Sequence, residues 1–283
     1  QTLAKHYLEC LNVKIVAITG SNGKTTTKDI VTSILETKFK VHKTQGNFNN
    51  ELGVPLTILA APEDSDILVL EMGADNFGQL DFLSKLVKPD YTIITNIGES
   101  HIEFFGSRAG IAKAKFEITN GMKKDGFFVY NGDEPLLKEL VENSSINATS
   151  CGENSYNDII LENYTITRDM IDFKLNIDEN NFSTTLKGKH NLFNIMFAVA
   201  IAKKIGLANE EIRHAIDNIS KITNMRLESI TYGEDSLIIN DAYNASPTSM
   251  KAAVDVISDL NDFEFKTLFL GSMFELGPNE VEY

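Results

Sequence analysis

The sequence has few cysteines and a deficit of positive charge. Cys10 and Cys151 are the two cysteines among 283 residues, they lie far apart, and no metal-binding or redox motif surrounds either. We therefore expect free thiols in a reducing cytosol rather than a disulfide framework. The 40 acidic residues outnumber the 26 Lys and Arg, which gives a formal net charge of -14. Without any long basic run, this balance argues against nucleic acid and anionic membranes as partners, and small anionic substrates would need local cations.

Long apolar runs, repeats and low-complexity segments are also absent. No apolar stretch approaches the roughly 18 residues of a membrane span, and no signal peptide is recognisable. We therefore expect a cytoplasmic protein without membrane insertion. The length suggests about two domains, and the 42% of hydrophobic residues can bury a substantial core.

The segment VKIVAITGSNGKTTT, residues 13–27, carries the strongest local pattern. Its apolar, β-branched start predicts a buried strand, the GSNG tetrapeptide predicts a tight loop, and helical spacing begins at Lys24. A strand, a glycine loop and a helix start can hold a phosphate, because backbone N–H groups and the helix N-terminus face the anion. Lys24 would neutralise phosphate charge, and the Thr25 hydroxyl would reach Mg²⁺.

This loop is shorter than the general phosphate-binding pattern. The form G-x-x-x-x-G-K-[ST] places a glycine five residues before Gly23, where this sequence has Ile18. What is present is Gly20-x-x-Gly23-Lys24-Thr25, and GKT by itself is a weak signal. An ordinary glycine turn is the alternative, but the flanking strand and helix favour nucleotide binding.

Two later strands end in side chains that suit metal or phosphate chemistry. Residues 67–70 are apolar and lead into Glu71, and residues 91–95 run into NIGESH, which ends at His101. An open parallel sheet binds its ligands at the carboxyl ends of its strands. We therefore predict that Glu71 binds Mg²⁺, with a plain strand-end acid as the alternative. A metal or phosphate contact is predicted for His101, although a lone histidine is usually structural or on the surface.

The segment GNFNNELGVP, residues 46–55, has the composition of a loop, because Asn and Gly are typical of turns. Two interpretations remain open for it, a polar surface loop and a loop that faces substrate.

Strands and helices alternate up to about residue 130, which predicts a doubly wound, mostly parallel α/β sheet. Beyond that point, short alternating runs predict antiparallel strands, which we assign to a small subdomain near residues 155–187. These runs are residues 158–164, 170–177 and 181–186.

Residues 188–206, which begin GKHNLFN, predict a return to helix. Asn191 and Asn194 lie three positions apart, so they share one face near its N-terminus. Their amides could hydrogen-bond a base or a ribose, and helix capping is the alternative for Asn191.

The composition changes again near MRLE, residues 225–228. Residues 237–239 predict a strand that ends in NDAYNASP, Pro247 lies near the start of a predicted helix, and residues 267–270 predict a further strand. We interpret this order as a second βαβ unit that opens a separate domain. At roughly 57 residues, it is too short to complete an open α/β sheet.

Seven motifs in order resemble those of the Mur ligases of bacterial cell-wall synthesis. They are TGSNGKTT, EMG at residues 71–73, NIGESH, KAK at residues 113–115, GKHNxxN, MRLE and NDAYNASP. The resemblance covers nearly the whole chain, and the short phosphate loop is the form that this family uses. It implies a central ATP-binding domain over residues 1–226 and the beginning of a Rossmann-like domain over residues 227–283. It also implies that nearly all of an N-terminal UDP-sugar domain is missing.

The resemblance also assigns site residues. It implies that the loop surrounds the ATP phosphates and that Thr25, Glu71 and His101 serve the metal ions. The implied catalytic residues are Lys24, Glu71, His101 and Lys115. Lys115 aligns with a lysine that several members carry as a carbamate, which could hold Mg²⁺, and a plain surface ammonium is the alternative. The implied ATP-binding residues are Gly20, Ser21, Asn22, Gly23, Lys24, Thr25, Thr26, Asn191, Asn194, Arg226 and Asp241, and the implied substrate residues are Asn47, Asn49 and Asn50.

Within the family, GNFNNELGVPL and NDAYNASPTSM resemble the member that joins D-alanyl-D-alanine to UDP-N-acetylmuramoyl-tripeptide. The resemblance therefore implies an ATP- and Mg²⁺-dependent amide ligase with an acyl-phosphate intermediate, and we expect a monomer. Two alternatives remain. One is another ligase with this core, such as a different Mur ligase or a folylpolyglutamate synthase, and the other is a nucleotide-binding module that has lost catalysis.

Overall fold

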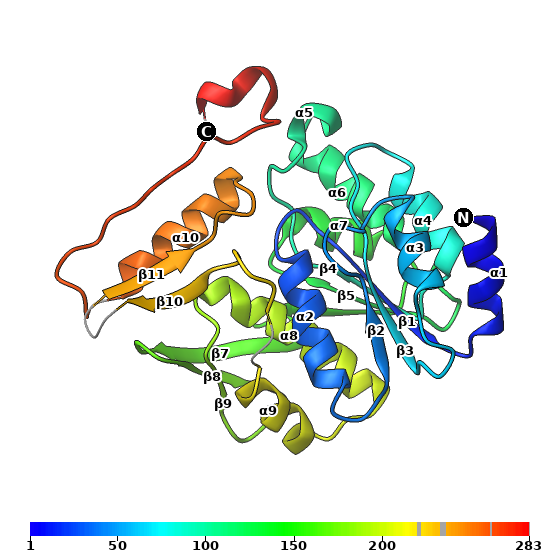
Figure 1. Ribbon diagram of the computed structural model, residues 1–283, viewed down its shortest axis with the longest axis horizontal. Coiled ribbons are helices and arrows are strands. Elements are labelled where there is room, and N and C mark those ends of the chain that lie inside the picture. The colour runs from blue at the N-terminus through cyan, green and yellow to red at the C-terminus, as the bar shows by residue number, and fades with distance from the viewer. Residues whose placement is uncertain (220–221, 233–235, 261, 283) are drawn as a thin grey trace.

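A computed structural model describes residues 1–219, 222–232, 236–260 and 262–282. Within these residues, nine strands form one sheet in the order β2-β3-β1-β4-β5-β6-β7-β8-β9, with helices on both faces (Figure 1). The strands are β1 (Lys14–Thr19), β2 (Val41–Lys43), β3 (Ile67–Glu71), β4 (Tyr91–Ile94), β5 (Phe127–Asn131), β6 (Ala148–Gly152), β7 (Ile159–Ile166), β8 (Ile171–Leu175) and β9 (Phe182–Thr184).

The first seven strands of this order pair in parallel, so the doubly wound, mostly parallel sheet is confirmed. β1 lies between β3 and β4, with Ile18 opposite both Glu71 and Ile93. This pairing brings the ends of the three strands to one edge, as the sequence predicted. The helices are α1 (Thr2–Cys10), α2 (Lys24–Leu35), α3 (Gly53–Leu59), α4 (Gln79–Val87), α5 (Ile102–Phe105), α6 (Arg108–Phe116), η1 (Glu117–Thr119), α7 (Pro135–Glu142), α8 (Lys189–Ile205) and α9 (Asn209–Asp217).

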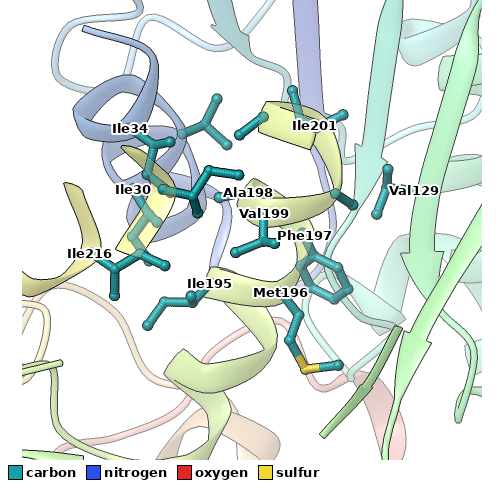
Figure 2. Close-up of a cluster of buried hydrophobic side chains, with 14 of the residues drawn as sticks. Ile30, Ile34, Val129, Ile195, Met196, Phe197, Ala198, Val199, Ile201 and Ile216 are labelled. Carbon is teal, nitrogen blue, oxygen red and sulfur yellow. The ribbon is translucent and has the colours of Figure 1, made fainter. Parts of the chain in front are cut away.

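The two faces of the sheet each have their own hydrophobic core. Val16 and Ile18 of β1 belong to one cluster, whereas Ile15 and Ala17 belong to the other. Because both faces are covered, β1 is a continuous apolar run rather than an alternating one. Helix α8 fills the first core with a nearly unbroken apolar stretch, Ile195 to Ala202, packed against α2 (Figure 2).

The predicted antiparallel strands are present, but they continue the large sheet. β7 pairs in parallel with β6, where Cys151 lies opposite Ile159, and then antiparallel with β8, which pairs with β9. Phe173 and Phe182 of these strands are buried in the same cluster as Val16 of β1. This region therefore shares the main core instead of building one of its own.

The C-terminal part begins with an antiparallel pair, β10 (Glu228–Tyr232) and β11 (Ser236–Asn240), followed by α10 (Pro247–Asp259) and η2 (Gly277–Glu282). The strand and the helix were predicted. The strand predicted over residues 267–270 is wrong, because these residues have no strand conformation and Phe269 is 96% exposed. A strand forms only where a second strand supplies hydrogen bonds, and no described segment pairs with this one. The predicted βαβ unit is therefore not formed among the described residues.

Among the residues that the structure describes, no helix combines the length and the apolar character that crossing a membrane requires.

Candidate functional site

The glycine loop between β1 and α2 lies tightly against β4. Gly20 has φ 144° and Gly23 has φ 80°, which are conformations that residues with a Cβ rarely adopt. A Cβ on Gly20 would lie 2.0 Å from Oγ1 of Thr95, and one on Gly23 would lie 2.8 Å from Oδ1 of Asn194. The loop therefore needs glycine at both positions for its backbone path and for its close packing.

Two side chains that sequence reasoning missed hold this loop in place. Oδ1 of Asn96 accepts a hydrogen bond from the backbone N–H of Asn22 at 2.8 Å, and the Thr95 hydroxyl donates to the Asn22 carbonyl at 2.5 Å. Both follow the end of β4. Their position as polar residues at the carboxyl end of a strand beside β1 was a signal that could have identified them.

Lys24 occupies the first position of α2 and folds back over the loop. Its Nζ donates to the carbonyl oxygens of Gly20 at 2.8 Å and Ser21 at 3.2 Å. Burial lowers the pKa of Lys24, Glu71 opposes this effect, and the positive charge of Arg226 adds to it. The ammonium group is thus close to the loop and within electrostatic reach of a second cation, an arrangement that favours an anion between them.

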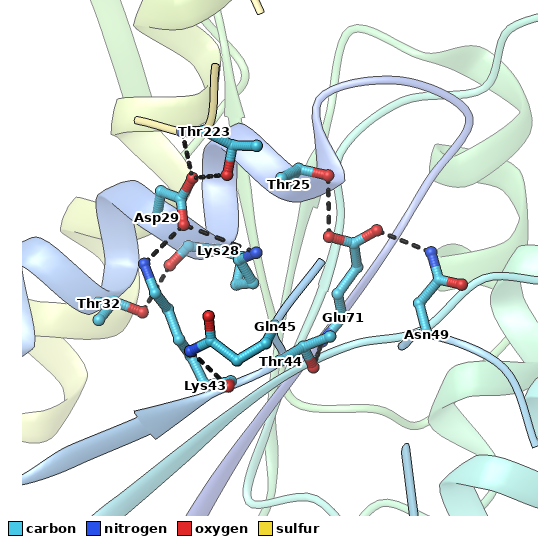
Figure 3. A network of polar contacts seen from close by, with 10 residues as sticks. All are labelled: Thr25, Lys28, Asp29, Thr32, Lys43, Thr44, Gln45, Asn49, Glu71 and Thr223. Atoms are coloured by element: carbon cyan, nitrogen blue, oxygen red, sulfur yellow. Dashed lines mark hydrogen bonds and ion pairs between the residues drawn. The ribbon is translucent and has the colours of Figure 1, made fainter. Parts of the chain in front are cut away.

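Glu71 and Thr25 form the pair predicted for magnesium. Thr25 Oγ1 donates to Glu71 Oε2 at 2.9 Å, and Asn49 Nδ2 donates to Glu71 Oε1 at 2.9 Å (Figure 3). Thr44, which the sequence analysis missed, accepts the Glu71 backbone N–H through its hydroxyl at 3.0 Å. The carboxylate is 3% exposed and has only neutral direct partners among the described side chains.

The oxygen atoms of this pair fit a Mg²⁺ ion that is also bound to the phosphates of a nucleotide. Mg²⁺ binds oxygen, and it often takes one carboxylate and a hydroxyl from the protein while phosphates and waters complete its shell. In the part of the chain that the structure describes, no group of three or more His, Cys, Asp or Glu could form a metal cage. The hydroxyl of Thr25 and the carboxylate of Glu71 therefore suit a metal ion whose remaining ligands are phosphate oxygens and waters.

His101 and Lys115 lie near this loop but contact other partners. His101 has a left-handed backbone, φ 63°, at the start of α5, and its Nδ1 lies 2.5 Å from Oε2 of Glu275. Burial lowers the pKa of His101; Glu275 opposes this, whereas the charges of Lys115 and Lys24 add to it. The C-terminal segment thus reaches His101, a contact that the sequence analysis did not predict.

Lys115 is buried, so its interpretation as a surface ammonium is wrong. Only 1% of the residue is exposed, and Nζ donates to the carbonyl oxygen of Ala74 at 3.0 Å. Burial lowers the pKa of Lys115 to about 7, with the charge of Lys24 acting in the same direction. Near neutral pH, a large fraction of this side chain is therefore an uncharged amine.

Asn191 and Asn194 are brought together beneath the phosphate loop. Asn194 Nδ2 donates to Asn191 Oδ1 at 2.9 Å, and Asn194 Oδ1 accepts from the Thr27 hydroxyl at 3.1 Å. Asn191 also donates to the carbonyl of Lys187, just before α8, at 2.7 Å. Asn191 lines a cleft of about 780 Å³, and Asn194 does not.

This cleft extends from α2, the helix after the glycine loop, to β10 and β11. Thr26 of α2 and Asn191 of α8 line it together with Arg226. Arg226 stacks on Tyr243, with the guanidinium carbon 3.9 Å from the ring centroid, and its buried Nε has no hydrogen-bond partner among the residues that the structure describes. Asp241 does not line the cleft and instead accepts the backbone N–H of Leu227 at 3.1 Å. Burial raises the pKa of Asp241.

The three asparagines of the loop after β2 have different surroundings. Asn49 contacts Glu71, as described above. Asn50 Oδ1 accepts the backbone N–H groups of Leu52 at 3.1 Å and Gly53 at 2.8 Å, so it stabilises the start of α3. Asn47 is exposed, and its carbonyl accepts the Asn49 N–H at 2.7 Å.

Helix α10 begins against the glycine loop, which is a further contact that the sequence did not predict. Its N-cap residue Ser246 donates to Oδ1 of Asn22 at 3.2 Å, and the Thr248 hydroxyl donates to Oε2 of Glu99 at 2.5 Å. Pro247 predicted the start of this helix, but not its neighbour. The loop is therefore contacted by the C-terminal part of the chain as well as by the central sheet.

Comparisons with known proteins agree with this geometry. Residues 18–202 match the family described as Mur ligase middle domain. The UDP-N-acetylmuramoyl-tripeptide--D-alanyl-D-alanine ligase of Bacillus subtilis (strain 168) is 48% identical over 288 residues, which cover 100% of this chain and 61% of that protein. Crystal structure I of MurF from Acinetobacter baumannii has a TM-score of 0.92 at 33% identity and covers 99% of this chain and 61% of that one.

A MurF structure from Thermotoga maritima in complex with ADP has a TM-score of 0.87 at 29% identity and covers 99% of this chain and 65% of that one. The chain thus spans about three fifths of the length of the curated relative, which is 61% covered. The family match extends over more than half of the 283 residues. This chain is therefore a member of the Mur ligase family.

Proposed function

We propose that this chain is the ATP-binding part of a ligase that joins D-alanyl-D-alanine to UDP-N-acetylmuramoyl-tripeptide. The observation that carries the proposal is the glycine loop with its adjoining Thr25–Glu71 pair, in a chain that is 48% identical over its whole length to a ligase of that name. Residues 1–226 would form the central ATP-binding domain, and residues 227–283 would open a C-terminal domain. We also propose a cytoplasmic location. The free thiols of Cys10 and Cys151 support it, because thiols stay reduced in the cytosol.

The proposed reaction forms an amide in two steps. A carboxylate oxygen of the tripeptide attacks the γ-phosphorus of ATP, which breaks the bond to the β–γ bridging oxygen and releases ADP. The amine of D-alanyl-D-alanine then attacks the acyl-phosphate carbonyl carbon, and phosphate leaves as the nitrogen loses a proton. The first step brings two anions together, and a single pair of charges 4 Å apart repels by about 4 kcal/mol at an effective dielectric constant near 20.

The chain's own residues can offset this repulsion. The backbone N–H groups of the loop from Gly20 to Thr26 would bind the β- and γ-phosphates, and Lys24 would exchange its loop carbonyls for phosphate oxygens. Thr25 and Glu71 would hold Mg²⁺, which when bound neutralises charge on the phosphates. Arg226, which lines the cleft together with Thr26 of the same helix as Lys24, would approach the γ-phosphate.

Lys115 is suited to carry a carbamate. Its amine has a pKa of about 7, so the uncharged form that carbamate formation needs is available near neutral pH. The nitrogen lone pair would attack the carbon of CO₂, and one proton would leave the nitrogen. The product is an anionic oxygen ligand near Lys24 and His101, where a second metal ion could bind. His101 would serve that metal ion.

The nucleoside would occupy the cleft of about 780 Å³ that Asn191 lines. Asn191 and Asn194 would approach the adenine, and Asp241 the ribose, after small movements of the residues that now occupy their hydrogen bonds. Asn47, Asn49 and Asn50 would contribute to the UDP-substrate side, and Asn49 would connect that side to Glu71, to which it donates a hydrogen bond. We also propose that the protein is a monomer.

The test has two arms. Lys24→Ala should abolish Mg-ATP binding by this chain in isothermal titration calorimetry, while the exposed Lys38→Ala should bind as the unmodified chain does. The protein that contains this chain is then supplied with ATP, UDP-N-acetylmuramoyl-tripeptide and one amine at a time. Phosphate release with D-alanyl-D-alanine, but not with meso-diaminopimelate, lysine or glutamate, supports the proposal. Release with a different amine would assign it to a related ligase, and no release with any amine would favour a non-catalytic module.

A further inference from the structure

Asp29 is a buried carboxylate that the proposed mechanism does not use. It lies in the second turn of α2, within the sequence TTTKDIVTSIL, and is 1% exposed (Figure 3). A buried carboxylate is costly unless ion pairs and hydrogen bonds satisfy it. The groups that bind Asp29 therefore show which segments of the chain it holds together.

Asp29 joins α2 to two distant segments. Its Oδ1 accepts from Nζ of Lys43 in β2 at 2.7 Å, and Nζ of the neighbouring Lys28 is 3.6 Å away. Its Oδ2 accepts both the backbone N–H of Thr223 at 2.9 Å and the Thr223 hydroxyl at 2.7 Å. Burial would raise the pKa of Asp29, but these ion pairs and hydrogen bonds outweigh it and hold the pKa below its ordinary value.

Thr223 belongs to the segment that carries Arg226. Met225 and Leu227, on either side of Arg226, have left-handed φ values of 58° and 51°. Non-glycine residues adopt this conformation at a cost, so the surrounding contacts must hold the segment in it. The two hydrogen bonds from Thr223 to Asp29 are contacts of this kind on the N-terminal side, and the Leu227 N–H bond to Asp241 is one on the other side.

The same helix carries the proposed magnesium ligand. Thr25 and Asp29 are four positions apart on α2, so their side chains lie on one side of the helix, one turn apart. Thr25 contacts Glu71 at the carboxyl end of β3, and Asp29 contacts Thr223 (Figure 3). The first two turns of α2 therefore connect the phosphate loop, which precedes the helix, to the segment that carries Arg226.

We infer that Asp29 is a positioning residue, which through Thr223 holds residues 222–226 so that Arg226 faces the phosphate loop. This inference rests on the proposed function, because it takes the γ-phosphate of ATP as the group that Arg226 binds. ADP lacks that phosphate. Asp29 should therefore matter for the binding of a nucleoside triphosphate and have little effect on the binding of a diphosphate.

The experiment compares Mg-ADP with Mg-AMPPNP, a non-hydrolysable ATP analogue, by calorimetry on this 283-residue chain. Asp29→Asn keeps the shape of the side chain but turns one acceptor into a donor that faces Lys43 or the Thr223 N–H. We expect its Kd for AMPPNP to rise about tenfold, as for the loss of a hydrogen bond to a charged group, while the Kd for ADP changes less than about twofold. Asp64→Asn is the matched control, because Asp64 pairs with Lys40 on the surface.

A second pair of variants keeps the test valid if Asp29→Asn does not fold. Thr223→Val removes the hydroxyl at nearly constant volume, and Thr223→Ser retains it. Thr223→Val should weaken AMPPNP binding several-fold, and Thr223→Ser should bind both nucleotides as the unmodified chain does. Equal weakening of ADP and AMPPNP by Asp29→Asn or Thr223→Val, together with a lower Tm, would show a merely structural role and overturn the inference.

Arg226→Ala separates this inference from the proposed function. If Arg226→Ala leaves the ratio of the two Kd values unchanged, the proposed role of Arg226 fails and the inference fails with it. If Arg226→Ala abolishes the preference for AMPPNP but neither Asp29→Asn nor Thr223→Val reduces it, the inference alone is wrong. If Asp29 acts through Arg226, the double variant should lose no more of the preference than Arg226→Ala does.

Discussion

The hydroxyl of Thr25 donates a hydrogen bond to Oε2 of Glu71 at 2.9 Å and so joins two residues that are 46 positions apart. One is in the first turn of the helix after the phosphate loop, and the other is the last residue of the neighbouring parallel strand β3. In the proposed function, this hydroxyl and this carboxylate would be the protein's ligands to a Mg²⁺ ion whose remaining ligands are phosphates and waters.

Glu71→Gln should raise the Mg²⁺ concentration needed for nucleotide binding. The amide keeps the size of the side chain but removes the negative charge that would hold the ion, so we expect the half-saturating Mg²⁺ concentration to rise by about tenfold or more. A Mg²⁺ titration of ATP binding measures the effect. Glu9→Gln makes the same chemical change at a side chain that is 56% exposed, and it should leave the titration unchanged. Coincident curves for Glu71→Gln and the unmodified chain would rule out the ligand role.

Gly20→Ala should destabilise the fold and weaken nucleotide binding. The new methyl group would lie 2.0 Å from Thr95 Oγ1, and φ at this position is 144°. We expect a loss of about 3 kcal/mol or more in the free energy of unfolding, measured in urea. Gly46→Ala is the matched control, since φ is 53° there and, apart from its two chain neighbours, no described residue has an atom within 4 Å of the added Cβ. Its cost should be only the backbone strain of about 1–2 kcal/mol. Similar losses for the two variants would contradict the proposed packing of the loop on β4.

His190 should make the protein less stable in mild acid. Burial lowers the pKa of His190 to about 4, although Asp255 opposes the shift. Well above a pH of about 6.5 the imidazole is neutral in both the folded and the unfolded chain, so it does not change the free energy of unfolding. Between about pH 6.5 and 4 the unfolded chain binds a proton that the folded chain excludes, so the free energy of unfolding falls as the pH falls, by about 1–3 kcal/mol in total.

His190→Gln should flatten this part of the stability curve, as measured by urea unfolding at a series of pH values. The control is His6→Gln, because His6 is an exposed histidine whose side chain is 71% accessible. The free energy of unfolding of His6→Gln should fall between about pH 6.5 and 4 as steeply as that of the unmodified chain. An unchanged slope in His190→Gln would show that other groups cause the acid sensitivity.

Local patterns predicted the parts of the site that depend on neighbours in sequence. The glycine loop follows from a strand and a helix that adjoin it, and Glu71 follows from the rule that parallel strands present their carboxyl ends at one edge. Lys115 illustrates the limit of such patterns. The sequence left a carbamate and a plain surface ammonium open for it, and only the packing of α6 beside Ala74 rules out the surface position.

Contacts between distant segments were not predictable in this way. The wrong strand at residues 267–270 has the composition of a strand, but composition cannot supply a pairing partner. The joining of β7 to β6 was missed because register between strands is set by packing rather than by either sequence alone. Asp29 was missed for the same reason, although an acid within an otherwise buried helix was a detectable anomaly.

The continuation of the large sheet through β9 has a consequence for substrate access. Arg168 and Asp169, at the turn between β7 and β8, line the cleft of about 780 Å³, and this hairpin belongs to the large sheet and packs in its core. Glu228 and Leu237 also line the cleft, and they come from strands that pair only with each other among the described residues. Because the first hairpin belongs to the large sheet and β10 and β11 form a sheet of their own, we expect the cleft to widen by displacement of β10 and β11.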